Sequence, residues 1–223
     1  MRLAIFDLDQ TLLAGDSDFL WGQFLVDQGR VDRAFYEREN QRFYDEYKAG
    51  TLDILEFCQF SLAPLAAHDL ATLLAWREQF VLERIVPIIA PLTPMLLEKH
   101  RSQGDFLLIT TATNRFVTEP IAQLLGVDAL IATDPEFDGE RYTGRVAGPP
   151  NFQAGKVTRL ERWLAEQPEP AEHMVCYSDS HNDLPLLQRA DIAVAVDPDP
   201  KLRTEADKRG WSVISLRGDA LQA

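Results

Sequence analysis

The sequence predicts an α/β fold, in which a doubly wound parallel sheet carries helices on both faces and an all-helical cap is inserted after the first strand. Two observations predict it. Over residues 91–223, short apolar segments that suit buried strands alternate with segments of about ten residues that suit helices, as in right-handed βαβ units. Residues 16–90, in contrast, show only the apolar spacing of helices.

The first predicted strand covers residues 2–8, where a short apolar run leads into two aspartates. A continuous apolar run of this length suits a strand that is buried on both faces. Ser17 is the expected cap of the helix that follows. The predicted helices of this segment are residues 17–29, 31–49, 52–62 and 68–84. We therefore expect a cap domain of residues 16–90 and a core of residues 1–15 and 91–223.

Strands and helices then alternate to the C-terminus. The predicted strands are residues 106–111, 129–132, 174–177, 192–196 and 211–216. The predicted helices are residues 94–102, 115–125, 156–166, 184–189 and 201–209. A polar stretch with two glycines at residues 138–144 is expected to form a hairpin.

The charge of the chain excludes two classes of partner. The 223 residues include 22 Lys and Arg against 35 Asp and Glu, a formal net charge of −13. Nucleic acids and anionic membranes are bound through clusters of Lys and Arg, so we expect neither as a partner. No run of 18 apolar residues occurs, and the N-terminal apolar stretch is too short for a signal peptide. We expect a cytoplasmic protein.

Polar residues that can do chemistry follow several predicted strands or open a predicted helix. Because ligands of open α/β sheets bind beyond the carboxyl ends of the strands, we expect these residues to converge. The candidates are Asp7, Asp9, Thr11, Thr111, Lys156, Asp179, Asn182 and Asp183.

Four carboxylates in one crevice would raise one another's pKa unless a cation lay among them. A ligand set made of oxygen atoms, without cysteine, favours Mg²⁺ over zinc. Such a site suits phosphoryl transfer, in which one aspartate attacks phosphorus and a second protonates the leaving oxygen. A lysine and a hydroxyl would stabilise the charge on the phosphoryl oxygens, and Lys156 and Thr111 are of these types.

Each candidate also has a plainer interpretation when it is taken alone. A lysine such as Lys156 is more often found on the solvent-facing side of a helix. Asp179 and Asp183 could cap a helix and complement its dipole. The combination of all the candidates, each at a strand exit or a helix start, favours the catalytic interpretation.

The segment from Asp7 to Thr11 resembles the DxDxT signature of the haloacid dehalogenase superfamily. Thr111, Lys156 and the acidic segment at residues 179–183 lie where that superfamily has its other motifs, with Tyr177-Ser178 in place of the usual preceding glycine. The helical insertion is similar to the small cap of the phosphoserine phosphatase-like branch.

The resemblance implies a Mg²⁺-dependent phosphatase that hydrolyses a small phosphorylated metabolite through an aspartyl-phosphate intermediate. Asp7 would be the nucleophile and Asp9 the general acid and base. Asp7, the main-chain carbonyl of Asp9 and Asp179 would hold Mg²⁺. Asp183 and Thr11 would contact these ligands and hold them in position without binding the metal themselves.

The resemblance also implies substrate contacts. Thr111, Lys156 and Asn182 would bind the phosphoryl group. Asp16 lies where phosphoserine-specific relatives have a carboxylate for the substrate amine, although it could equally be an acid at a helix N-terminus. Gln59 stands, by ungapped placement, where those relatives have an arginine for the substrate carboxylate. Because glutamine cannot form that charged bidentate pair, phosphoserine itself is disfavoured. Similar phosphatases of this branch act on histidinol phosphate, so the resemblance implies histidinol phosphate or a related amine-bearing metabolite.

Three alternatives remain at this point: a phosphoserine phosphatase, a phosphotransferase of the same superfamily, and, in a different class, a non-enzymatic receiver with a phosphoacceptor aspartate. Asp9 and the helical insertion argue against a receiver, which needs no acid to protonate a leaving group. Aromatic residues of the insertion could wall a pocket for a ring, although such residues more often form core. They are Trp21, Phe24, Phe43 and Tyr44.

Overall fold

Six parallel strands form the sheet predicted from the sequence, in the computed structural model that describes residues 1–218. Their order is β3-β2-β1-β6-β7-β8, so β1 is central and the order reverses on either side of it. Such a reversal makes the crevice beyond β1 the expected ligand site. The strands are β1 Arg2–Phe6, β2 Phe106–Asn114, β3 Ala129–Thr133, β6 His173–Ser178, β7 Ile192–Val196 and β8 Ser212–Ile214.

Helices cover both faces of this sheet, as predicted. Successive residues of β1 point to opposite faces, so Ala4 and Phe6 join one hydrophobic cluster and Leu3 and Ile5 the other. The first cluster includes residues of α5 and α6, and the second residues of α7, α8 and α9. These helices are α5 Thr93–Ser102, α6 Arg115–Leu125, α7 Ala154–Ala165, α8 Leu184–Leu187 and α9 Pro200–Arg209.

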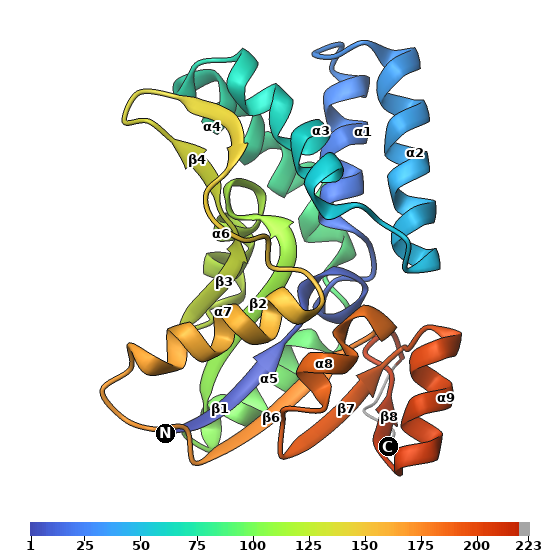
Figure 1. Ribbon diagram of the computed structural model, residues 1–223, viewed down its shortest axis with the longest axis vertical. Helices are drawn as coiled ribbons and strands as arrows, with labels where there is room; N and C mark the ends of the chain where they lie inside the picture. The colour runs from blue at the N-terminus through green and yellow to red at the C-terminus, as the bar shows by residue number, and fades with distance from the viewer. Residues whose placement is uncertain (219–223) are drawn as a thin grey trace.

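A helical segment lies between β1 and β2 in the chain and beyond one end of the sheet (Figure 1). Its two ends run side by side, because Leu13 and Ile89 form an isolated antiparallel bridge. Shorter helical turns at Val81–Ile85 and Val86–Ile88 lead back to the core. Its helices are α1 Ser17–Asp27, α2 Arg33–Ala49, α3 Ile54–Ala67 and α4 Leu70–Phe80.

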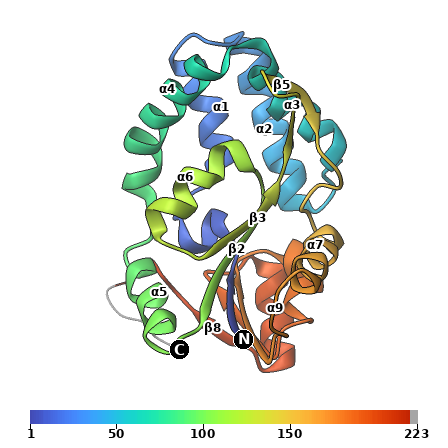
Figure 2. The same ribbon diagram turned by 90° about the vertical axis from the view of Figure 1, so that its left-hand side faces the viewer.

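The hairpin of β4 (Pro135–Phe137) and β5 (Tyr142–Val146) forms where it was predicted and packs along α3 (Figure 2). Gly144 lies so close to α3 that an added Cβ would be 3.1 Å from the Ala66 side chain. A hairpin of the predicted core therefore packs against a helix of the predicted cap. The division of the chain into two domains stays a prediction.

Aspartates cap several of the helices, which corrects one prediction. Ser17 is not the cap of α1, because it already lies in the first turn; Asp16 precedes it and accepts a hydrogen bond from the Phe19 N–H at 2.8 Å. Part of the acidic excess of the chain is thus used to satisfy helix N-termini. The capping aspartates are Asp16, Asp32, Asp53, Asp69 and Asp199. Within residues 1–218, no helix is long and apolar enough to cross a membrane.

Candidate active site

Asp7 follows β1 directly and is 4% exposed. Its N–H donates to the carbonyl of Tyr177 at 2.9 Å, so the end of β1 is tied to β6. The chain then turns sharply through residues 8–12, with Gln10 in the left-handed region at φ 59°. The turn carries Asp9 and Thr11 back over the end of the sheet.

Lys156 lies buried between two carboxylates. Its Nζ donates to Asp7 Oδ1 at 2.7 Å and to Asp183 Oδ2 at 2.8 Å, and Ser178 Oγ donates to the same Asp183 oxygen at 2.7 Å. Burial alone would lower the pKa of Lys156, but the charges of Asp183 and Asp7 outweigh it and raise the pKa, so the ammonium keeps its proton. The solvent-facing interpretation of this lysine is therefore wrong.

A close backbone approach brings Lys156 to this position. Gly155, at the start of α7, lies against the Pro150 carbonyl, and a Cβ on it would be 2.4 Å from that oxygen. Only glycine allows this separation without a shift of the helix. The first turn of α7 can therefore enter the crevice and deliver the lysine beside Asp7.

Thr11 joins the two carboxylates that were predicted to hold a metal. Its Oγ1 is 3.3 Å from Asp7 Oδ2 and 3.0 Å from Asp179 Oδ1, and it accepts the N–H of Asp179 at 3.0 Å. One hydroxyl proton serves only one of the two carboxylates. Burial raises the pKa of Asp7 to about 7, which Lys156 only partly offsets. Burial, followed by the charges of Asp7 and Asp183, raises the pKa of Asp179 well above its usual value.

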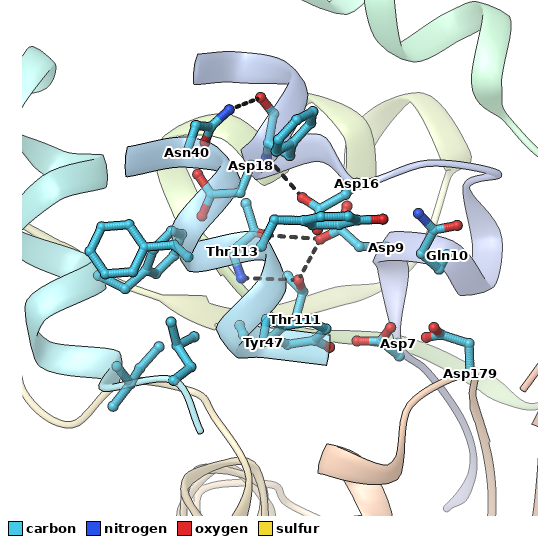
Figure 3. Close-up of a pocket in the computed structure, with 17 residues that line it drawn as sticks. Asp7, Asp9, Gln10, Asp16, Asp18, Asn40, Tyr47, Thr111, Thr113 and Asp179 are labelled. Atoms are coloured by element: carbon cyan, nitrogen blue, oxygen red, sulfur yellow. Dashed lines mark hydrogen bonds between the residues drawn. The ribbon is translucent and has the colours of Figure 1, made fainter. Parts of the chain in front are cut away.

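Asp9 accepts hydrogen bonds from two threonines of β2 (Figure 3) and from a main-chain N–H of α1. Its Oδ2 accepts from Thr113 Oγ1 at 2.8 Å and from Thr111 Oγ1 at 3.4 Å, and its Oδ1 accepts from the Ser17 N–H at 2.6 Å. Burial raises the pKa of Asp9 to about 6, and the Asp16 carboxylate adds to the rise. A carboxyl group of this kind exchanges its proton near neutral pH.

A cavity extends from Asp7, Asp9 and Asp179 into the helical segment (Figure 3). It is lined by 17 residues, all of them within residues 1–218. None of them is Lys, Arg or His. Asp16 caps α1, which confirms the capping interpretation, and it also lines this cavity, so its contact with a substrate amine stays a prediction. The lining residues are Asp7, Asp9, Gln10, Asp16, Asp18, Phe19, Asn40, Phe43, Tyr44, Tyr47, Leu52, Ile54, Phe57, Thr111, Ala112, Thr113 and Asp179.

Two predicted substrate contacts lie elsewhere. Gln59 is exposed and does not line the cavity; Ile54 and Phe57 occupy the cavity-facing side of α3, and Gln59 lies further around the helix. Asn182 is buried, but its amide donates to the Tyr47 carbonyl at 3.2 Å and accepts from Gln153 at 3.0 Å. These contacts join the core to α2, and the contact of Asn182 with the phosphoryl group stays a prediction.

Sequence reasoning missed several residues of the cavity. Thr113 was missed because β2 continues three residues past the predicted strand end. Phe43 and Tyr44 line the cavity, as one hypothesis held, whereas Trp21 and Phe24 are buried in the core. Asp18, which lines the cavity, carried only the ordinary signal of an acid in the first turn of a helix.

The donors around Asp7 suit a hard divalent cation. Within residues 1–218, no three side chains of His, Cys, Asp or Glu are grouped as metal ligands. The predicted Mg²⁺ site needs only the carboxylates of Asp7 and Asp179, which share Thr11, together with a main-chain carbonyl. Mg²⁺ keeps several water ligands and is commonly bound through one or two carboxylates, so this donor set fits it.

Comparisons with known proteins identify the family of this chain. A family model for haloacid dehalogenase-like hydrolases matches residues 4–188. A protein named histidinol-phosphatase from Neisseria meningitidis serogroup C (strain 8013) is 43% identical over 220 residues, which cover 97% of this chain and 99% of that protein.

Solved structures share the fold. A protein of unknown function from Bordetella pertussis Tohama I is 44% identical, with a TM-score of 0.91 over 96% of this chain and 98% of that one. A substrate-bound phosphoserine phosphatase is 19% identical, with a TM-score of 0.69 over 97% and 93% of the two chains, and shows the fold alone. The receiver alternative is therefore wrong: the chain belongs to the haloacid dehalogenase-like hydrolase family and is a phosphatase.

Proposed function

We propose that this phosphatase hydrolyses histidinol phosphate, with Mg²⁺ and through a phosphorylated aspartate. The observation that carries the choice of substrate is the lining of the cavity next to Asp7. It presents Asp16 and Asp18 and several aromatic rings, and no basic side chain. Histidinol phosphate bears an amine and an imidazole ring and lacks a carboxylate. The 43% identical relative named histidinol-phosphatase supports the same substrate.

The same lining disfavours phosphoserine. A substrate carboxylate needs a cationic partner when it is taken out of water, and a like charge beside it costs several kcal/mol. In the cavity beside Asp7 it would face Asp16 and Asp18, and none of the lining residues is Lys, Arg or His; Lys48 lines the neighbouring cavity that Asp16 also borders. The substrate amine, in contrast, would pair with the Asp16 oxygen that is not used in capping α1.

In the first chemical step, a carboxylate oxygen of Asp7 attacks phosphorus. The bond from phosphorus to the ester oxygen breaks, and Asp9 gives its proton to the departing alcohol. Thr113 and the Ser17 N–H hold the Asp9 carboxyl group above Asp7 for this transfer. A pKa near 6 keeps a useful fraction of Asp9 protonated near neutral pH.

In the second step, water attacks the phosphorus of the acyl phosphate and Asp9 takes up its proton. The bond between phosphorus and Asp7 breaks, and inorganic phosphate leaves. The Lys156 ammonium and the Thr111 hydroxyl stabilise the phosphoryl oxygens in both steps, and Asp183 holds Lys156 in place. Bound Mg²⁺ would neutralise negative charge between Asp7, Asp179 and the phosphoryl group.

A substrate series tests the choice of substrate. We expect kcat/KM for histidinol phosphate to exceed that for O-phosphoserine by at least about 100-fold, because only phosphoserine brings a carboxylate to the acidic cavity. Ethanolamine phosphate, which has the amine and neither ring nor carboxylate, should lie between them. Equal or better hydrolysis of phosphoserine would contradict the proposal.

Metal removal tests the Mg²⁺ site. Dialysis against EDTA should abolish hydrolysis, and added Mg²⁺ should restore it, because Asp7 and Asp179 would otherwise repel the phosphate. Calorimetry should detect Mg²⁺ binding to the wild type and much weaker binding to the Asp179→Asn variant. Full activity after chelation would show that the metal is not needed.

Substitution of Lys156 tests the phosphoryl contact. Lys156→Met should lower kcat by about 10²–10³ because one preorganised charge is lost. It should also lower the free energy of unfolding by about 3–5 kcal/mol, because Asp7 and Asp183 are left buried without their cation.

The double variant Lys156→Met/Asp183→Asn is the matched control. It removes one of the two unpaired carboxylates, so thermal denaturation should show part of the stability restored, while kcat stays low. A single Lys156→Met variant with wild-type kcat would contradict the assigned role of the lysine.

A further inference from the structure

Asp18 is a carboxylate without a partner at the end of the cavity away from Asp7 (Figure 3). Asp16 already caps α1, so Asp18 is not needed for capping. No described residue donates a hydrogen bond to it. Burial, with added repulsion from Asp16 and Asp9, raises its pKa well above the usual value. No hydrogen bond offsets the loss of water around this partly buried carboxylate, so a use in substrate binding would explain its presence.

Asn40 supplies a second acceptor at the same place. It is 7% exposed and lines the same cavity. Its amide nitrogen donates to the Phe19 carbonyl at 2.9 Å, and its side-chain oxygen has no hydrogen-bond partner within residues 1–218. Figure 3 shows the Asn40 amide beside the Asp18 carboxylate. This oxygen is not fully buried, so it can accept a hydrogen bond from a ligand in the cavity.

Gly22 makes room for this arrangement. It lies one turn after Asp18 on α1, so both face the same side of the helix. A Cβ on Gly22 would be 3.0 Å from the side-chain oxygen and nitrogen of Asn40. The Asn40 side chain of α2 therefore packs against the main chain of α1 at Gly22, next to Asp18.

We propose that Asp18 and Asn40 form a subsite that accepts the N–H groups of the substrate's imidazole ring, so that Asp18 is a specificity-determining residue. The proposal rests on histidinol phosphate as the substrate. Its amine and its ring would then be bound by different acids, Asp16 and Asp18.

The surroundings of the subsite suit a flat, donor-bearing ring. Phe43 and Phe57 line the cavity, as do Phe19 and Tyr44, whose rings lie 5.0 Å apart between centroids. Aromatic walls favour a planar ring over a flexible chain. An imidazolium offers two N–H donors and a positive charge, and Asp18 and Asn40 offer matching acceptors.

The test compares two substrates that share the amine and differ in the ring, histidinol phosphate and phenylalaninol phosphate. For the wild type, kcat/KM should favour histidinol phosphate. Asp18→Asn should lower the ratio of the two kcat/KM values by roughly 10- to 100-fold, the effect of one charged hydrogen bond. Asp16→Asn is the matched control: it should lower kcat/KM for both substrates and leave their ratio unchanged.

Thermal denaturation separates this role from a structural one. Trp21 Nε1 is buried without a hydrogen-bond partner within residues 1–218, and Trp21 and Asp18 line the same small inner cavity. A purely structural role for Asp18 would therefore be to accept a hydrogen bond from Trp21 Nε1 through a water molecule. A binding role predicts an equal or higher melting temperature for Asp18→Asn, because an unpaired charge is removed. A lower melting temperature with an unchanged substrate ratio would overturn the subsite. A wild type that does not hydrolyse histidinol phosphate would overturn the proposed function as well.

Discussion

The buried ammonium of Lys156, shared by Asp7 and Asp183, is the interaction on which the site depends. It joins three segments that are far apart in the sequence: the exit of β1, the loop after β6 and the start of α7. Removing a charged group from water is costly, and this cost is offset only because all three partners meet at short distances. The same contact holds an oxygen of Asp7 beside the strand ends, where the phosphoryl group would bind.

The acidic excess of the chain has several separate origins. Aspartates such as Asp32, Asp53 and Asp69 satisfy helix N-termini far from the cavity. Asp7 and Asp179, the proposed metal ligands, line the cavity together with Asp16 and Asp18. The net charge of −13 therefore gives no general attraction for a phosphate. Under the proposed function, the charge that binds the phosphoryl group would be local, from Lys156 and bound Mg²⁺, and the acids of the cavity would select a substrate with a cationic group.

The strands and the polar residues that follow them could be predicted from the sequence, because a short apolar run and the residues after it are local signals. Asp7, Asp9, Thr111 and Asp179 were identified in this way, and Lys156 as a polar residue at the start of a predicted helix. The cavity wall could not be predicted, since it depends on which faces of α1, α2 and α3 meet. Asn40 lies within a polar helix and becomes part of the cavity only because Gly22 of another helix lets it approach. Gln59 was misplaced for the same reason, because an ungapped placement does not fix the rotation of a helix.

The proposed function depends on a covalent bond between Asp7 and phosphorus, which rapid-quench mass spectrometry can detect. The enzyme is mixed with Mg²⁺ and any phosphomonoester that it turns over, quenched in acid within one turnover and digested. If Asp7 is the nucleophile, the peptide that contains Asp7 gains one phosphoryl group, and the same peptide of the Asp7→Asn variant gains none. A phosphoryl group on another residue, or turnover with no covalent adduct at any time point, would contradict it.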